Sequence, residues 1–345
     1  MKMSIRIVQF SHPGVEHMLT RRELKTSPIV KEWNNGAHKR KFLRARGVCV
    51  SSDDTLSEEK DLLFWGEWEP YSEVEVLTYN MAQKNRLLPT YVHKPFLKVQ
   101  RNGSPYYYIY FPPTPKSKNS LARVSCTDII CDKNKIPRSN TDPFVFGDYF
   151  LYSCCRQYKK NGGLSYTYMK YLKEGSLILF GSSVLNSPNE EPYFALDTVF
   201  VVAESRLYNI DTYDKDLSDF IPQYYDEIMG FKYWDKGIEM RCYHGATVEN
   251  RINGMYSFVP CKSCSSETPS WGFERPKLRA SMFNHIVKGS KSIINEKASQ
   301  GFRSFDKNCY AFFDEETVSQ VWQLVREQVL AQGFEIGVRI KYELH

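Results

Sequence analysis

The sequence contains no run of 18 apolar residues, so no segment could form a transmembrane helix, and we expect no membrane partner. Its first ten residues lack the long apolar core and the small-residue cleavage site of a secretory signal, because Arg6 and Gln9 interrupt a short apolar run. A glycine-rich phosphate loop is also absent, as are the Walker and dinucleotide fingerprints. We therefore expect no bound cofactor.

The composition is that of a folded soluble protein. Of the 345 residues, 42% are apolar and 25% are charged, which allows a sizeable core and suits one large domain or two ordinary ones. The nine cysteines are odd in number, and Cys154 and Cys155 are adjacent, which argues against a disulfide scaffold. Reduced thiols indicate a cytoplasmic location.

Positive and negative charges are segregated near the start of the chain. The 46 Lys and Arg against 40 Asp and Glu give a net charge of +6, which permits an anionic partner. Residues 38–46 carry five basic side chains and no acid, whereas residues 53–61 carry five acids and one lysine. These runs are either two solvated faces that offset each other or, for the first, a phosphate-binding element. Its members are Lys39, Arg40, Lys41, Arg44 and Arg46.

Strand patterns outnumber helix patterns and do not alternate with them regularly, which favours an α+β fold. We expect a β-rich mixed sheet or a partly closed barrel, followed by a C-terminal amphipathic helix. Asp314 can cap that helix, apolar residues then recur on one face, and Gly333 ends it.

The proline-rich residues 112–120 form the best linker in the chain. A single compact domain remains an alternative to a division at this point. The expected units are a β-rich N-terminal module with the basic segment at 1–112, a linker or loop at 113–139, and a mixed α+β module at 140–345.

Residues 65–69 place two carboxylates between aromatic side chains. On a strand, Glu67 and Glu69 point to the same face about 7 Å apart, and Trp65 shares that face. Like charges at this distance raise each other's pKa, which suits one acid and one base. A solvated acidic face is the alternative, although a tryptophan is seldom placed on such a face.

Asp142 precedes a proline at the start of an aromatic strand, with Asn140 just before it. An acid here could activate a water molecule, while Phe144 and Phe146 could stack on a planar ring. The alternative, favoured for any single residue, is an Asx-turn that opens a core strand, with the phenylalanines buried.

Asp197 interrupts a strand pattern that is apolar on both faces. A bare buried charge is too costly there, so the carboxylate is hydrogen-bonded or functional, and a structural hydrogen bond is favoured.

A polar group near the start of the chain contains three of the seven histidines. Residues beside a turn suit ligand contacts, although surface or capping roles explain each of them alone. The candidates are His12, His17, Asn34 and His38.

Half of a zinc-ribbon pattern is present. Cys261 and Cys264 have the spacing of one zinc knuckle, but Cys242 and His244 form a non-standard second half. Plain reduced cysteines are therefore favoured, and we expect no metal, with zinc at these four residues as the alternative.

Several polar strings form a joint pattern: His12-Pro13-Gly14-x-Glu16-His17, Trp33-Asn34, His38-x-Arg40-Lys41-Phe42, Gly66-Glu67-Trp68-Glu69, Asn140-Thr141-Asp142-Pro143-Phe144 and Phe180-Gly181-Ser182. This pattern, within residues 10 to 200, resembles bacterial and phage nucleotide-modification-associated proteins, which are thought to act with enzymes that alter DNA bases. The resemblance implies a nucleic-acid setting and assigns no catalytic residue. Residues 140–143 also resemble the water-activating Asp-Pro turn of uracil-DNA glycosylases, although the glutamine and tyrosine flanking that turn are missing here.

The first hypothesis is an enzyme that acts on a nucleotide or on a modified base in DNA. Asp142 would activate water for hydrolysis of a glycosidic bond, Glu67 or Glu69 would stabilise the charged transition state, and Asp197 completes the expected catalytic set. The alternatives are a module that binds the base without changing it and a protein-interaction subunit. The expected substrate contacts are His12, His17, Asn34, His38, Arg40, Lys41, Arg44, Asn140, Phe144, Phe146 and Gln157.

Overall fold

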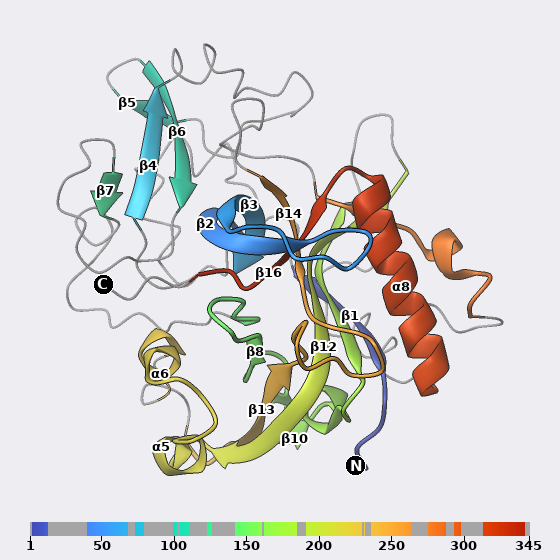
Figure 1. The fold of residues 1–345 in the computed structure, drawn as a ribbon. Coiled ribbons are helices and arrows are strands. Elements are labelled where there is room, and N and C mark those ends of the chain that lie inside the picture. Colours follow the sequence, from blue (N-terminus) through green and yellow to red (C-terminus); the bar gives the residue numbers. More distant parts are fainter. Residues whose placement is uncertain are drawn as a thin grey trace.

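The protein is described by a computed structural model that contains two β-sheets and few helices (Figure 1). The described residues are 2–12, 40–67, 73–78, 99–101, 104–110, 123–125, 142–160, 162–184, 191–229, 231, 236–263, 275–287, 293–297 and 313–341. The expected linker at 112–120 lies outside them.

One sheet has six strands and is mixed. β1 (Ile7–His12) runs parallel to β11 (Leu177–Val184), and the other pairs are antiparallel. The first six residues of β11 are all buried, as expected for a strand covered on both faces. The remaining strands are β12 (Tyr193–Asn209), β13 (Glu239–Gly245), β8 (Leu151–Tyr152) and β15 (Lys277–Leu278).

The second sheet contains a closed ring of four strands. β2 (Arg40–Val50) pairs with β3 (Lys60–Glu67) and β16 (Glu335–Val338), and β14 (Val259–Ser263) pairs with both β3 and β16. Ring closure satisfies backbone groups that would otherwise lie on a free edge. The expectation of a β-rich fold with a mixed sheet and a barrel is confirmed. Strands that extend this sheet are β6 (Ser104–Tyr110), β4 (Glu73–Thr78), β7 (Arg123–Ser125) and β5 (Val99–Arg101).

The expected C-terminal helix is also confirmed, as α8 (Glu315–Ala331). The Asp314 carboxylate accepts a hydrogen bond from the Thr317 amide at 2.7 Å, which caps the first turn. Figure 1 shows α8 beside the six-stranded sheet, and its buried face joins residues of β11 and β12 in one core cluster. Shorter elements are α5 (Tyr213–Asp216), α6 (Gln223–Met229), the 3-10 helices Tyr168–Tyr171 and Ala280–Phe283, and the hairpin β9 (Tyr158–Lys159) with β10 (Ser165–Tyr166).

The strand β3 contributes to two separate parts of the core. Leu62 and Phe64 belong to one hydrophobic cluster, whereas Leu63 and Trp65 belong to the other. Trp65 is only 2% exposed, so it is a core residue and not the aromatic wall of a carboxylate-lined face, as the sequence had suggested. The side chain of Glu67 is not among the described ones.

Strands from the start of the chain are hydrogen-bonded to strands near its end. β1 pairs with β11, β3 pairs with β14, and β2 pairs with β16. Segments on both sides of the expected linker therefore share each sheet. Among the described residues, no helix has the length and apolar character needed to cross a bilayer.

Candidate functional site

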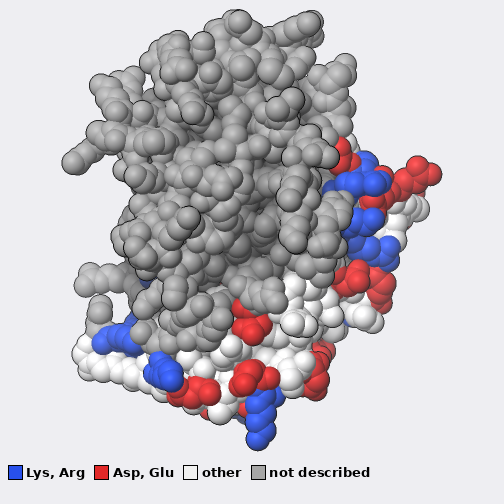
Figure 2. All heavy atoms as spheres, turned by 90° about the vertical axis from the view of Figure 1, so that its left-hand side faces the viewer, with Lys and Arg blue, Asp and Glu red and all other residues white. Residues whose placement is uncertain are grey.

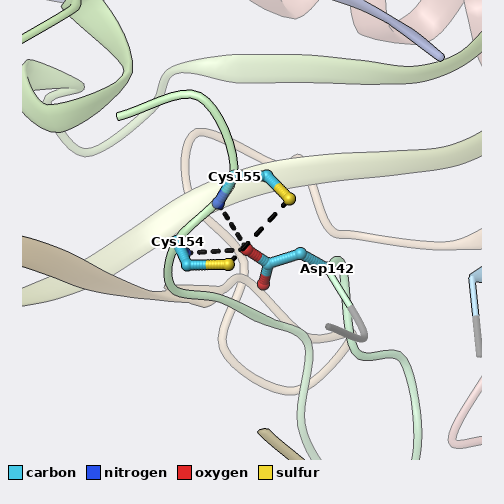
Figure 3. A group of neighbouring side chains, drawn as sticks. All are labelled: Asp142, Cys154 and Cys155. Atoms are coloured by element: carbon cyan, nitrogen blue, oxygen red, sulfur yellow. Dashed lines mark hydrogen bonds between the residues drawn. The ribbon is translucent and has the colours of Figure 1, made fainter. Parts of the chain in front are cut away.

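Asp142 lies in a turn that surrounds its carboxylate with main-chain donors (Figure 3). It is fully buried, at 0% exposed. Its Oδ1 accepts from the Ser153 amide at 2.9 Å, and its Oδ2 accepts from the amides of Cys154 and Cys155 at 2.7 and 2.9 Å. The turn after β8 thus directs three successive N–H groups at one carboxylate.

The described partners of Asp142 are amides and a thiol, without a cation among them. Burial raises the pKa of Asp142, and this effect outweighs the hydrogen bonds from the amides and from the Cys154 thiol, which act in the opposite direction. In the described part of the chain, no Lys, Arg or His is bonded to this carboxylate. Burial also raises the pKa of the Cys154 thiol. The group is therefore a buried carboxyl held by neutral donors.

This geometry changes the roles expected for the Asp142 segment. A fully buried carboxylate bonded to three amides has no access to a water that it could activate for attack. Phe144 and Phe146 are also 0% exposed, with ring centroids 5.3 Å apart, so they pack in the core and cannot stack on a base. The burial of Phe144 and Phe146 agrees with the alternative interpretation. Asp142 does not form the expected Asx-turn, because the donors to its carboxylate are the amides of residues 153–155.

Gln157 is likewise committed to the fold. Its amide nitrogen donates to the Arg241 carbonyl at 2.7 Å, and its carbonyl oxygen accepts from the Arg241 amide at 2.8 Å. The side chain therefore acts as a substitute strand partner for β13 and is buried there. A substrate contact at Gln157 would require breaking this pair of bonds.

Asp197 forms a buried ion pair. Arg275 Nη1 donates to Asp197 Oδ1 at 3.0 Å and to Ser182 Oγ at 2.9 Å. The Arg275 guanidinium also lies 5.9 Å from the ring of Trp65. The predicted structural bond at Asp197 is thus present, and its partner is an arginine 78 residues away in the chain.

The described residues contain a cavity of about 410 Å³ lined by residues 147–150, 247–257 and the end of β16. Buried Phe150 and Val338 form apolar walls, and the exposed Asp148, Glu249 and Arg339 provide charge. Arg339 forms an ion pair with Glu249. The remaining lining residues are Gly147, Thr247, Val248, Asn250 and Ser257.

The cavity wall is held in an uncommon backbone conformation. Arg339 has φ of 46°, in the left-handed region that costs a residue with a side chain on the order of 1 kcal/mol. Gly147, at φ 71°, donates its amide to the Ile340 carbonyl at 2.6 Å and thereby joins the wall to the end of β16. Because its walls come from three distant segments, no local sequence signal marks this cavity.

Two exposed cations are connected through the main chain to the cavity segment that contains Arg339. The amide of Lys341 donates to the Arg46 carbonyl at 2.7 Å, which joins the chain after Arg339 to β2. The side chains of Arg46 and Lys341 are 54% and 52% exposed, and both pair with Glu59. From Arg46 the strand runs back through Arg44 to Arg40, which lies about 20 Å away at strand spacing. The basic run therefore begins at the strand position to which this segment is bonded.

The zinc-ribbon alternative is not assembled among the described residues. Cys242 is on β13, and the neighbouring His244 bonds through its ring to the Phe220 carbonyl at 2.5 Å. Cys261 lies in the barrel, with its sulfur 3.6 Å from that of Cys49. Cys264 is outside the described residues.

The remaining predicted site residues are described in part or not at all. For one group the backbone alone is described: His12, Arg40, Lys41, Arg44 and Glu67. His12 is the register partner of Ser182, and Arg40 that of Glu67. The others lie outside the described residues: Glu69, His17, Asn34, His38 and Asn140.

Comparison of the chain with protein-family models, with curated proteins and with solved structures finds no match. The functional argument therefore depends on the geometry of the cavity and of the charges around it.

Proposed function

We propose that the protein binds a nucleotide or a nucleic acid, with a base in the cavity beside Arg339 and phosphates along the basic strand β2. The observation that carries the proposal is the joint position of the two features. Arg339 lines the cavity, the main chain two residues further on, at Lys341, is bonded to Arg46, and the basic run continues from Arg46 along the same strand.

The size and lining of the cavity support a base as its occupant. A volume of about 410 Å³ falls within the range of small-molecule sites. Phe150 and Val338 offer apolar surface to a flat ring, while Asp148 and Asn250 can bond to the polar groups on its edge. The resemblance to nucleotide-modification-associated proteins points to a modified base in DNA.

The charges around the cavity support one orientation of the ligand. Asp148 and Glu249 would repel a phosphate, whereas Arg46 and Lys341 would attract it. Figure 2 shows that charges of both signs are interspersed over the described part of one face, without a large single-sign patch there. We therefore assign phosphate binding to Arg46 and Lys341 and not to a general positive surface.

Recognition without hydrolysis is the activity that the geometry favours. Glycosidic hydrolysis at Asp142 would need an accessible carboxylate, and Asp142 is enclosed by its turn. The two carboxylates in the described cavity lining are Asp148 and Glu249, and Glu249 is held in an ion pair with Arg339. Binding of a modified base thus takes precedence over its removal.

The test is fluorescence anisotropy of a labelled single-stranded oligonucleotide, and of a matched strand with 5-methylcytosine, at low salt and near 0.2 M salt. We expect binding that weakens steeply with salt. The double variant Arg46→Gln/Lys341→Gln should make the slope of log affinity against log salt shallower by about 2. Lys215→Gln/Lys236→Gln, which changes two exposed lysines elsewhere, is the matched control.

A second variant separates base recognition from phosphate binding. Asp148 is exposed on the cavity rim, so Asp148→Ala should reduce the preference between the two strands and leave the salt slope unchanged. Absence of binding at low salt would refute the proposal. Equal losses of oligonucleotide affinity in the Arg46/Lys341 variant and in its lysine control would also refute the proposal.

A further inference from the structure

Asp142, Cys154 and Cys155 form a compact group of potential metal ligands (Figure 3). One carboxylate oxygen and the two sulfurs all lie within 4.8 Å of one another. The sulfurs are 3.9 Å apart. A tetrahedral zinc ion with Zn–S bonds of about 2.3 Å separates two sulfur ligands by roughly 3.8 Å. The thiols thus stand at the spacing that such an ion requires.

The charge of the site points to a cation as its occupant. Asp142 is fully buried, and its bonded partners in the described chain are neutral amides and a thiol. Buried carboxylates are ordinarily paired with a cation or bound to a metal. Asp197 in this same protein follows that rule through Arg275, which makes the missing countercharge at Asp142 a specific feature of its site.

We propose that Asp142, Cys154 and Cys155 bind a thiophilic divalent cation of the Zn²⁺ class. Two sulfur ligands and one carboxylate oxygen suit zinc or cadmium better than magnesium or calcium. Cys155 is only half-buried, so a water molecule on its side supplies the fourth ligand of a tetrahedral ion.

Binding follows a simple proton balance. The two thiols lose their protons to solvent, and the thiolates and the carboxylate coordinate the ion, so the net charge of the site stays at −1. One carboxylate oxygen of Asp142 coordinates the ion beside the two sulfurs. The amides of residues 153–155 then serve as supporting donors that orient the carboxylate.

The test is titration of the reduced full-length chain with Cd²⁺ alone, followed by the thiolate-to-cadmium charge-transfer absorption. We expect one tightly bound ion with an intensity that corresponds to two thiolates. Cys155→Ser should weaken this binding by more than about tenfold, because it removes one sulfur ligand. Since Cys155 is half-buried, the variant should fold, which circular dichroism checks.

The control is Cys49→Ala. Cys49 and Cys261 are another close pair of thiols, with sulfurs 3.6 Å apart. Among the described residues, this pair is not part of a group of three potential metal ligands. The Cd²⁺ titration of Cys49→Ala should therefore match that of the unchanged protein. Absence of a charge-transfer band, a band that Cys155→Ser leaves unchanged, or an intensity that corresponds to four thiolates would each overturn the proposal. Zinc content of the purified protein, measured by atomic emission, should be one ion per chain.

Discussion

Asp142 and Asp197, the two fully buried carboxylates among the described residues, are stabilised in different ways. Asp142 is bonded to amides only 11 to 13 residues along the chain, whereas Asp197 pairs with Arg275, 78 residues away. The first carboxylate organises a local turn, and the second connects separate segments of the six-stranded sheet. The comparison teaches that burial alone does not identify a functional acid, because each carboxylate has a structural role. The two carboxylates differ in the charge of their partners, which are neutral amides at Asp142 and an arginine at Asp197.

The largest expected effect is at the ion pair. Arg275→Met removes the cation that faces a fully buried carboxylate, and breaking a buried ion pair costs about 3–5 kcal/mol. Urea denaturation of the variant and the unchanged protein would measure the loss. The double variant Asp197→Leu/Arg275→Met should recover part of the stability, because it removes both charges. A loss below 1 kcal/mol in the single variant would contradict the assigned role of Arg275.

A smaller loss is expected at the local turn. Asp142→Asn preserves the shape but replaces one acceptor oxygen with an NH₂ group, so at least one of the three amides loses its partner. An unsatisfied buried group costs about 1–3 kcal/mol. The measurement is urea denaturation in the presence of a chelator. Asp148→Asn, an exposed substitution nearby, should stay within about 0.5 kcal/mol. If Asp142→Asn lowered the free energy of unfolding more than Arg275→Met does, the expected order of the two effects would be wrong.

A still smaller change tests how Arg275 is oriented. Ser182→Ala removes one hydrogen bond from Arg275 Nη1 while leaving the ion pair in place. The expected cost is about 1 kcal/mol, which thermal or urea unfolding can resolve. If the cost equalled that of Arg275→Met, the serine and not the carboxylate would be the main partner of the arginine.

The smallest effect is a change in pH dependence at Asp142. Burial raises the pKa of its carboxyl in the folded protein above the ordinary value of 3.8. The folded state therefore holds this proton more strongly than the unfolded state, so the contribution of Asp142 to stability grows as the pH falls from the folded pKa toward 3.8. The stability difference between the unchanged protein and Asp142→Asn should widen over that interval. Chelated samples unfolded in urea across a pH series would show this trend, and a narrowing difference would indicate an ionised carboxylate stabilised by its amides.

Local interactions explain which parts of the fold could be predicted. The helix Glu315–Ala331 was expected because its cap at Asp314, its apolar face and Gly333 all lie within one short segment. The apolar runs at 176–180 and 193–202 indicate two strands, which the structure extends to residues 184 and 209, but these runs do not indicate which strands they pair with. Closure of the barrel depends on Ile336 meeting Val50, and no local pattern encodes that contact.

The candidate sites divide in the same way. A structural turn at Asp142 and buried phenylalanines after it were open alternatives in the sequence, since the donors lie close along the chain. For Asp197 the need for a bond could be inferred from its apolar neighbours, but Arg275 could not be named. The cavity at Arg339 was not anticipated at all, because three segments far apart in the sequence form its walls.

By itself, then, the sequence determined the β-rich class, the terminal helix, the basic run of β2 and the need for a bonded partner at Asp197. These depend on propensities and patterns within about ten residues. Tertiary structure alone decided the partner of Asp197, the burial of Trp65 and the position of the cavity at Arg339. Each of these is a contact or an exposure created when distant strands pair, and such pairing is a property of the whole chain.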